Sequence, residues 1–380
     1  MSVLRIGLST TTVEPVLTGG RLDGIGVYSQ ALLRHLPPAG CAVQAMSFAP
    51  FALSGSGADA LRVGAAMPHS FPVTTLRDLC TPGAVREHMP SVDLYHSTDY
   101  RTVRMDCMVV ATLHDALPLA HPEWCSPRLR GLKNWLQRKA ARKADHVIAV
   151  SHFAVRELVQ CFGIDERRIS VVHNGVDERW LDAPAPEAVA ATQAQYGLKP
   201  GYFLFVGTLQ PRKNLGRVLE AYLSLPPVVR AKRQLVVVGA PGWRSEELQA
   251  QMKAAVQNGE NVLWLDRLTH EEQLRHVYAG AGAFVFPSLY EGFGIPVVEA
   301  FASGVPVIAS NTSSLPEVTR GAALEVDPLS VPAIGAAMLE LARDDALRAR
   351  CVAAGRVRAV ELTWAETARK TAAVYHTLLS

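Results

Sequence analysis

The chain has 380 residues, of which 49% are hydrophobic and 19% charged, and its formal net charge is +3 at pH 7. This length accommodates two domains with separate cores, and the composition is that of a globular protein rather than a disordered one. A net charge this small gives no reason to expect nucleic acid as a partner. The six cysteines include no CxxC pair, which argues against a zinc site or a disulfide framework.

The N-terminal residues lead directly into a strand, without a charged leader or a long apolar run. No segment reaches the length of apolar sequence that a transmembrane helix needs. Together with the scattered cysteines, these features lead us to expect a protein that is made and kept in the cytoplasm.

The first half of the chain alternates short apolar runs with amphipathic stretches. The runs predict strands over residues 4–9, 42–47, 94–97, 108–113, 146–150 and 169–172. This alternation is typical of a parallel, doubly wound sheet. Ahead of a helix predicted over residues 27–36, four glycines crowd a loop: Gly19, Gly20, Gly24 and Gly26. Such a loop can hold phosphate, but it lacks the G-x-G-x-x-G spacing, and a plain connection is an equal alternative.

A histidine and an aspartate, His114 and Asp115, directly follow the strand predicted over residues 108–113. The carboxyl end of a parallel strand is where such folds place functional groups, although a lone histidine is more often structural.

Residues 127–145 carry seven cations and no acidic residue before Asp145. They lie on a predicted helix that also carries Leu129, Leu132, Trp135 and Leu136. One interpretation is a solvated helix face. The other is a peripheral membrane contact on anionic lipid, where each cation adds about 1 kcal/mol and the helix brings the protein to a lipid-linked acceptor.

Residues 180–199 are rich in Ala and Pro and show little periodicity, so we interpret them as an inter-domain linker. A second alternation follows, with strands predicted over 202–206, 234–238, 262–265, 283–286 and 305–309. Helices are predicted over 215–222, 331–344, 346–360 and 364–379.

Two adjacent cations, Arg212 and Lys213, precede the helix predicted from Leu215. Cations at a helix N-terminus are unfavourable for the helix dipole, so we interpret this pair as an anion site. The alternative is a solvated turn.

Residues 286–310 read FPSLYEGFGIPVVEAFASGVPVIAS and predict a strand end, a glycine-rich turn, a helix and a second strand. Pro296 suits the first turn of the helix, and Gly304 suits a left-handed end. At their spacing, the carboxylates of Glu291 and Glu299 can both face the carboxyl edge of a parallel sheet, where such folds bind ligands. The backbone N–H groups of the turn suit an anion or a sugar hydroxyl. The alternative is that Glu291 fills the turn and Glu299 is solvated.

This stretch resembles the retaining family-4 glycosyltransferases, whose two-domain architecture is called GT-B. The signature of that family is a Glu, seven residues and a second Glu, opened by EGFG-type residues, and Glu291 and Glu299 match it without a gap. The resemblance covers nearly the whole chain, through LHD at 113–115, ADHVIAVS at 144–151, NGVD at 174–177 and GTLQPRKN at 207–214.

The resemblance implies an α/β fold with two doubly wound parallel-sheet, Rossmann-like domains facing across a cleft. Residues 1–180 would form an N-terminal acceptor-binding domain and residues 200–360 a C-terminal nucleotide-sugar-binding domain. Residues 361–380 would form a terminal helix that crosses back to the N-terminal domain.

The resemblance also implies the roles of individual residues. The catalytic candidates are His114, which corresponds to a histidine beside the reacting sugar carbon, and Glu291, which would hold hydroxyls of the donor sugar. Glu299 would hydrogen-bond the ribose. In the commonest form of the family, an Arg and a Lys in the pattern G-R-x-x-x-x-K bind the donor diphosphate. Here Lys213 matches the Lys, Thr208 occupies the Arg position, and Arg212 is expected to replace it. The full set of donor-binding candidates is Gly24, Gly26, Thr208, Arg212, Lys213, Gly292, Phe293, Gly294 and Glu299.

These expectations describe a retaining hexosyltransferase that moves a sugar from a nucleotide-diphospho-sugar to a glycan or polyprenyl-linked acceptor, without a bound cofactor. No D-x-D appears in the sequence, so we expect no metal, with Arg212, Lys213 and backbone amides stabilising the leaving group. Front-face transfer is favoured over a covalent intermediate on Glu291, because no base candidate stands out on the acceptor side.

GTLQPRKN and LHDALPL are similar to motifs of bacterial mannosyltransferases of polysaccharide assembly, so GDP-mannose is the first expectation. UDP-glucose, UDP-N-acetylglucosamine and dTDP-rhamnose stay open as donors. Two alternatives come from other classes: a GT-B phosphorylase carrying pyridoxal phosphate, and a non-catalytic regulator that binds a nucleotide sugar.

Overall fold

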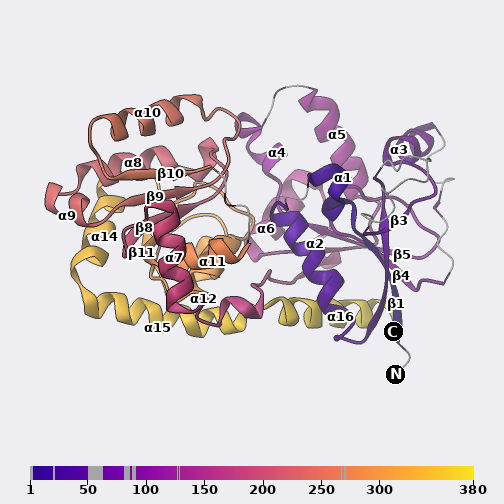
Figure 1. The fold of residues 1–380 in the computed structure, drawn as a ribbon. Helices are drawn as coiled ribbons and strands as arrows, with labels where there is room; N and C mark the ends of the chain where they lie inside the picture. The colour runs from indigo at the N-terminus through magenta and orange to yellow at the C-terminus, as the bar shows by residue number, and fades with distance from the viewer. Residues whose placement is uncertain are drawn as a thin grey trace. The chain divides into compact units, whose positions relative to one another are not determined.

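The computed structural model describes residues 3–19, 22–49, 63–80, 86–87, 91–125, 127, 129–266, 268 and 271–380. The chain divides into two compact units, each built on its own sheet (Figure 1). The first unit contains Met1–Pro122, Pro127–Asn174 and the C-terminal Trp364–Ser380. The second contains Glu123–Ser126 and Gly175–Thr363.

The first unit has a parallel sheet of seven strands in the order β3-β2-β1-β4-β5-β6-β7. Its strands are β1 (Leu4–Ser9), β2 (Cys41–Ser47), β3 (Ala65–Ala66), β4 (Leu94–Ser97), β5 (Met108–Leu113), β6 (His146–Ala149) and β7 (Ile169–Val171). Because β1 pairs with both β2 and β4, the strand order reverses there, as in doubly wound sheets that bind ligands at the carboxyl edge.

The described helices of the first unit are α1 (Pro15–Thr18), α2 (Gly24–His35), α3 (Phe71–Cys80), α4 (Leu117–Ala120), α5 (Arg130–Ala141), α6 (His152–Glu157) and α16 (Trp364–Leu379). Although α16 comes from the far end of the chain, it lies next to α2 (Figure 1).

Helix α2 begins three residues earlier than predicted, so Gly24 and Gly26 lie in its first turn rather than in a loop. The cause is Asp23, whose side chain caps the helix by accepting the Gly26 N–H at 2.8 Å. A side chain at Gly26 would meet the Thr12 carbonyl oxygen at 2.9 Å, so a glycine is needed there for packing. Gly20 lies outside the described residues.

The second unit has a parallel sheet of six strands in the order β10-β9-β8-β11-β12-β13. They are β8 (Tyr202–Val206), β9 (Leu235–Val238), β10 (Val262–Leu265), β11 (Ala281–Phe286), β12 (Val307–Ser310) and β13 (Leu324–Val326). Its helices are α7 (Pro186–Tyr196), α8 (Leu215–Ser224), α9 (Pro227–Lys232), α10 (Glu246–Gln257), α11 (Glu271–Ala279), α12 (Ile295–Ala302), α13 (Leu315–Thr319), α14 (Val331–Arg343) and α15 (Asp345–Glu361).

The fold class predicted from the sequence is confirmed, since both units are doubly wound parallel α/β structures. The central strands are buried on both faces, so their sequences are continuous apolar runs rather than alternating ones. In the second unit this core includes the side chains of Phe203, Phe205, Phe284 and Phe286.

The segment interpreted as a linker instead contains helix α7, which belongs to the second unit. It begins at Pro186, ends at the left-handed Gly197, and bonds to α11 through Thr192 and His276 at 2.8 Å. Its many alanines gave too weak a hydrophobic period to predict it.

Within the ranges described above, no helix has both the length and the apolar character needed to cross a membrane.

Candidate functional site

The turn between β11 and α12 has the backbone that its glycines predict. Gly294 has φ of 106° directly before α12, and Gly304 has φ of 69° after it, both in the left-handed region. A side chain at Gly294 would also meet the Leu315 Cδ2 atom at 2.6 Å. Pro296 lies in the first turn of α12, where its missing N–H leaves no bond unmade.

Three charged side chains meet at the carboxyl edge of the second sheet, and we call Arg212, Lys213 and Glu291 the Glu291 cluster. Lys213 Nζ lies 2.7 Å from Glu291 Oε1, and Arg212 Nη1 lies 3.1 Å from Oε2. Glu291 and Lys213 are 7% and 8% exposed. The two cations that the sequence analysis assigned to an anion site are therefore held on the carboxylate of Glu291.

Burial raises the pKa of the Glu291 carboxyl, but the charges of Lys213 and Arg212 outweigh burial and hold that pKa below its ordinary value. The carboxylate is therefore ionised at neutral pH, and the cluster carries one net positive charge. Lys213 Nζ also lies 4.8 Å above the ring centre of Phe286, which is a cation–π contact.

The loop that carries the cations is tied to the loop that carries Glu291. Arg212 and Lys213 lie in a 3-10 turn (Pro211–Lys213) rather than in α8, whose N-cap is the left-handed Asn214. The amide of Asn214 donates to the carbonyl oxygens of Pro287 at 2.8 Å and Pro328 at 2.7 Å. The backbone N–H of Leu289 donates to the Arg212 carbonyl at 2.8 Å. These bonds fix the spacing of the Glu291 cluster.

Two serines after β12 hold the glycine turn, and the sequence analysis did not assign them. The hydroxyl of Ser314 is shared between two acceptors, the carbonyl oxygens of Glu291 and Phe293, both 2.9 Å from its Oγ. Ser313 Oγ accepts the Glu291 N–H at 3.3 Å. The only signal in the sequence was a hydroxyl pair just past the end of a strand predicted over residues 305–309.

The second glutamate of the motif has a different partner. Glu299, half-buried in α12, accepts a hydrogen bond from the hydroxyl of Tyr278 in α11 at 3.0 Å. Burial, followed by the charge of Glu299, raises the pKa of Tyr278 well above its usual range, so the tyrosine stays a donor. Thr208, the remaining candidate of this unit, is exposed after β8.

In the first unit, His114 follows β5 and is 8% exposed. Its Nε2 lies 3.0 Å from the Thr98 carbonyl oxygen, which can only accept, so Nε2 carries the proton. Burial lowers the pKa of His114 below its usual value, although the Thr98 carbonyl and the carboxylates of Asp115, Asp99 and Asp23 favour the charged ring. The ring is therefore neutral at pH 7, with Nδ1 as its acceptor.

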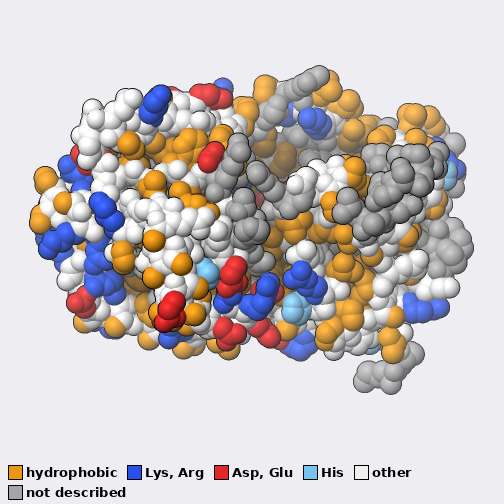
Figure 2. Space-filling model, viewed as in Figure 1, with side chains coloured by type: hydrophobic (Ala, Val, Ile, Leu, Met, Phe, Trp, Pro, Cys, Tyr) orange, Lys and Arg blue, Asp and Glu red, His pale blue; other side chains and the backbone are white. Residues whose placement is uncertain are grey.

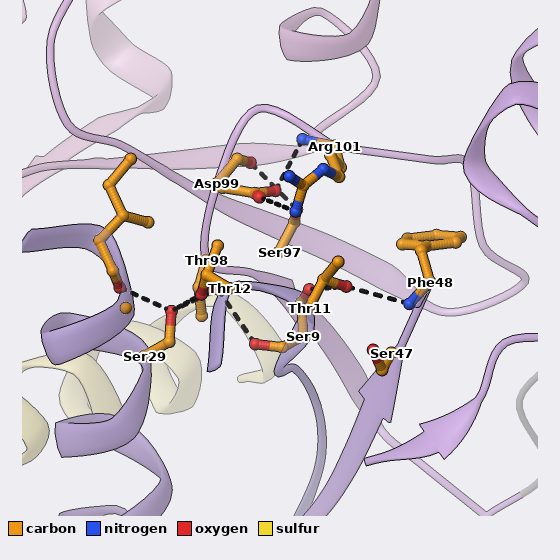
Figure 3. Close-up of polar contacts among 12 residues, drawn as sticks. Ser9, Thr11, Thr12, Ser29, Ser47, Phe48, Ser97, Thr98, Asp99 and Arg101 are labelled. Carbon is orange, nitrogen blue, oxygen red and sulfur yellow. Dashed lines mark hydrogen bonds and ion pairs between the residues drawn. The ribbon is translucent and has the colours of Figure 1, made fainter. Parts of the chain in front are cut away.

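Thr98 is itself fixed by a hydroxyl network that Figure 3 shows. Its Oγ1 donates to the Ser9 carbonyl at 3.0 Å and accepts from Ser29 Oγ at 2.8 Å. Thr12 Oγ1 donates to Ser29 at 2.7 Å. Ser9, Ser29 and Thr98 are almost completely buried, and Thr12 is half-buried. Because these groups bond to one another, they serve as a rigid base for the strand ends. Asp115, beside His114, accepts the Leu117 N–H at 3.0 Å and so holds the loop.

Within the basic segment 127–145, Arg130–Ala141 form helix α5, and the described cations of the segment fall into two groups. Arg130 and Arg142 donate to carbonyl oxygens, and the buried Lys143 pairs with Asp78 at 2.9 Å. Lys133, Arg138 and Lys139 are exposed, and so are Leu129, Leu132 and Trp135. Hydrophobic and basic side chains accordingly share the surface around α5 (Figure 2). Arg128 lies outside the described residues.

Comparison with known proteins identifies the family. The profile described as "Glycosyltransferase Family 4" matches residues 22–180, and the one described as "Glycosyl transferases group 1" matches residues 191–358. The O-antigen chain mannosyltransferase B of Escherichia coli is 32% identical over 288 residues, which are 75% of this chain and 74% of that protein. The chain belongs to the family-4 glycosyltransferases.

Two further similarities fit this membership. The alpha-maltose-1-phosphate synthase of Mycolicibacterium smegmatis is 30% identical over 284 residues, covering 70% of this chain and 72% of that protein. The solved structure of Anabaena Alr3699/HepE in complex with UDP and glucose has a TM-score of 0.71 at 16% identity and covers 98% of this chain and 100% of that one. The two parallel-sheet units of this glycosyltransferase are thus those of the GT-B fold.

Proposed function

We propose that this protein is a retaining hexosyltransferase that moves a sugar from a nucleotide-diphospho-sugar to a glycan or polyprenyl-linked acceptor in polysaccharide biosynthesis. The observation that carries the proposal is the Glu291 cluster, where a partly exposed arginine and a buried lysine hold a carboxylate at the carboxyl edge of a doubly wound sheet. Membership of the family-4 glycosyltransferases supports the same class of reaction.

In this proposal the carboxylate of Glu291 marks the place where the cations meet the donor diphosphate. When the diphosphate binds, it shares Arg212 and Lys213, and Glu291 becomes available to hydroxyls of the donor sugar. Glu299 binds the ribose, with Tyr278 orienting its carboxylate. The amides of residues 292–294 and the hydroxyl of Thr208 complete the donor contacts of this unit. In the first unit, Gly24 at the N-terminus of α2 contributes its backbone amide, whereas the N–H of Gly26 is already bonded to Asp23.

The proposed reaction breaks the bond between the sugar C1 and the diphosphate oxygen and forms a bond from C1 to the acceptor oxygen on the same face. The acceptor proton passes to an oxygen of the leaving phosphate, so no protein base is required. Arg212 and Lys213 stabilise the charge that develops on the diphosphate, a contribution that a metal makes in other transferases. His114, neutral and held by Thr98, lies against the sugar as C1 gains positive character.

We further propose GDP-mannose as the donor, because the 32% identical relative is a mannosyltransferase of O-antigen chains. A glucosyl donor with UDP is the second candidate, favoured by the fold shared with a protein solved with UDP and glucose. UDP-N-acetylglucosamine and dTDP-rhamnose are weaker candidates.

We propose that the protein binds to the cytoplasmic face of a membrane, and that helix α5 makes the contact. The exposed Leu132 and Trp135 would enter the lipid interface, while Lys133, Arg138 and Lys139 meet anionic headgroups. Reversing these three charges should release the protein from anionic liposomes, and unchanged binding would remove this part of the proposal.

A thermal-shift panel of sugar nucleotides, each with and without chelator, tests the donor site. One donor should stabilise the protein, equally with chelator, and Lys213→Met should abolish the shift. Lys232→Met, at an exposed lysine of α9, is the matched control and should keep it. If no sugar nucleotide stabilises the wild-type protein with or without acceptor, the proposed function is wrong.

A further inference from the structure

A chain of four buried polar side chains runs through the core of the first unit, beneath His114. Tyr28 Oη lies 2.7 Å from Thr112 Oγ1, which lies 2.8 Å from His96 Nε2, and His96 Nδ1 lies 2.5 Å from Tyr375 Oη. All four residues are 0% exposed. The chain therefore links α2, β5, β4 and the C-terminal helix α16.

Such a chain is unusual in a core that apolar side chains could fill. Buried polar groups must be satisfied by one another, and in return they fix one arrangement of the elements that carry them. His96 uses both ring nitrogens, and burial, followed by the charge of His114, lowers its pKa to about 3. It is therefore neutral at physiological pH.

The end of the chain is in contact with His114. The ring of Tyr28 meets the imidazole of His114 edge to face, with centroids 4.9 Å apart and planes at 86°. Trp364 of α16 packs on the same tyrosine at 6.2 Å. The imidazole is thus held at two points, by the Thr98 carbonyl at Nε2 and by the ring of Tyr28.

We infer that Tyr28 is a positioning residue for His114, and that the Thr112–His96–Tyr375 chain holds Tyr28 in place. The inference rests on the proposed function of His114 beside the reacting sugar. The hydroxyl of Tyr28 sets the orientation of the His114 imidazole, although in this scheme it touches neither donor nor acceptor. Helix α16, the last in the chain, thereby becomes part of the support of the catalytic candidate.

Tyr28→Phe tests the inference, because it keeps the ring and removes only the anchored hydroxyl. In protein labelled with ¹⁵N-histidine, long-range ¹H–¹⁵N spectra report the tautomer and the pKa of His114, assigned with His114→Asn. Wild type should show the neutral Nε2–H form with a midpoint below 6.5. Tyr28→Phe should move that midpoint upward, as water reaches a less firmly held ring among Asp23, Asp99, Asp115 and His96. Tyr375→Phe should do the same more weakly.

Activity provides the second readout. Tyr28→Phe should lower kcat about tenfold and leave the KM for the donor within about twofold. The acid limb of its pH–rate profile should shift to higher pH together with the titration midpoint of His114. Tyr222→Phe is the matched control, since its buried hydroxyl bonds to the carbonyls of Arg230, Arg233 and Asn261 at the amino edge of the second sheet. Tyr222→Phe should lower the free energy of unfolding but leave kcat, the acid limb and the His114 signals unchanged.

The outcomes separate this inference from the proposed function. If Tyr28→Phe and Tyr375→Phe both leave the His114 signals and the acid limb as in Tyr222→Phe, the positioning role is wrong while transfer stands. If the His114 signals move but wild type transfers no sugar from any donor, positioning stands and the proposed function falls. Near-ultraviolet circular dichroism confirms that each variant is folded.

Discussion

The replacement Glu291→Gln separates two roles of the Glu291 cluster, stability and chemistry. Glutamine has the shape of glutamate but cannot neutralise Lys213 and Arg212, whose side chains are 10% and 19% exposed. Removing one partner of a buried ion pair costs about 3–5 kcal/mol, because the other charge stays buried. We expect about 3 kcal/mol here, since Arg212 reaches solvent and the amide oxygen can still accept one bond.

The same change should strengthen binding of the free nucleoside diphosphate. Glu291 competes with the diphosphate for both cations, so its removal should raise that affinity about tenfold, which corresponds to about 1.4 kcal/mol. Turnover should nevertheless fall about 100-fold, because the sugar hydroxyls lose their carboxylate. The variant would thus bind product more tightly while working more slowly, a combination that general damage does not produce.

Urea unfolding, calorimetric titration with the diphosphate and single-turnover rates measure the three effects. Glu260→Gln is the control, because Glu260 pairs with Arg230 at 2.8 Å away from the cluster. Since the pKa of Glu291 is below its ordinary 4.5 in the folded state, its contribution is complete at neutral pH and is lost as the pH falls through that lowered pKa. The difference in the free energy of unfolding between wild type and Glu291→Gln should therefore decrease as the pH falls. A weaker diphosphate affinity in Glu291→Gln would refute the competition.

Three further predictions concern single positions. Glu299→Gln should weaken donor binding about tenfold in a titration while changing stability by less than about 1 kcal/mol, because Tyr278 can still donate to the amide oxygen; an unchanged donor affinity would remove Glu299 from the site. Gly294→Ala should lower the free energy of unfolding in urea by about 3 kcal/mol, because it adds a clash against Leu315 to an unfavourable positive φ. Gly259→Ala is the control, since its left-handed backbone faces open space, and it should lower that free energy by only about 1 kcal/mol. Equal losses in the two variants would contradict the packing argument. The buried His96 stays neutral in the folded protein, whereas its ring takes up a proton in the unfolded chain as the pH falls below 6.5. Between pH 7.5 and pH 5, the free energy of unfolding should therefore fall by about 2 kcal/mol more in wild type than in His96→Gln. An equal fall in both proteins would show that His96 is not buried as described.

The sequence predicted the strands of both sheets because parallel strands are apolar throughout. Leu4–Ser9, Met108–Leu113 and Tyr202–Val206 match their predicted ranges. Several elements were missed, among them helices α3, α9 and α10. Strands β3 and β13 are only two and three residues long, too short to show a period, and α7 is too rich in alanine to have an apolar face.

For the candidate site, the sequence indicated which residues matter but not what they touch. The spacing of Glu291 and Glu299 placed both near one sheet edge, yet Glu291 is paired with the two cations, while Glu299 is bonded to Tyr278. That difference depends on packing between α11 and α12, which no local pattern records. In the buried Tyr28–Thr112–His96–Tyr375 chain, directly bonded residues lie up to 279 positions apart, so it appears only in three dimensions.

The most direct test of the central claim is the anomeric configuration of the product formed from GDP-mannose, an α-linked donor, followed by nuclear magnetic resonance in the presence of chelator. The account predicts an α-mannoside, formed without added metal and not formed by Lys213→Met. A β-linked product would contradict the retaining reaction, and transfer that stops with chelator would contradict the role given to Arg212 and Lys213.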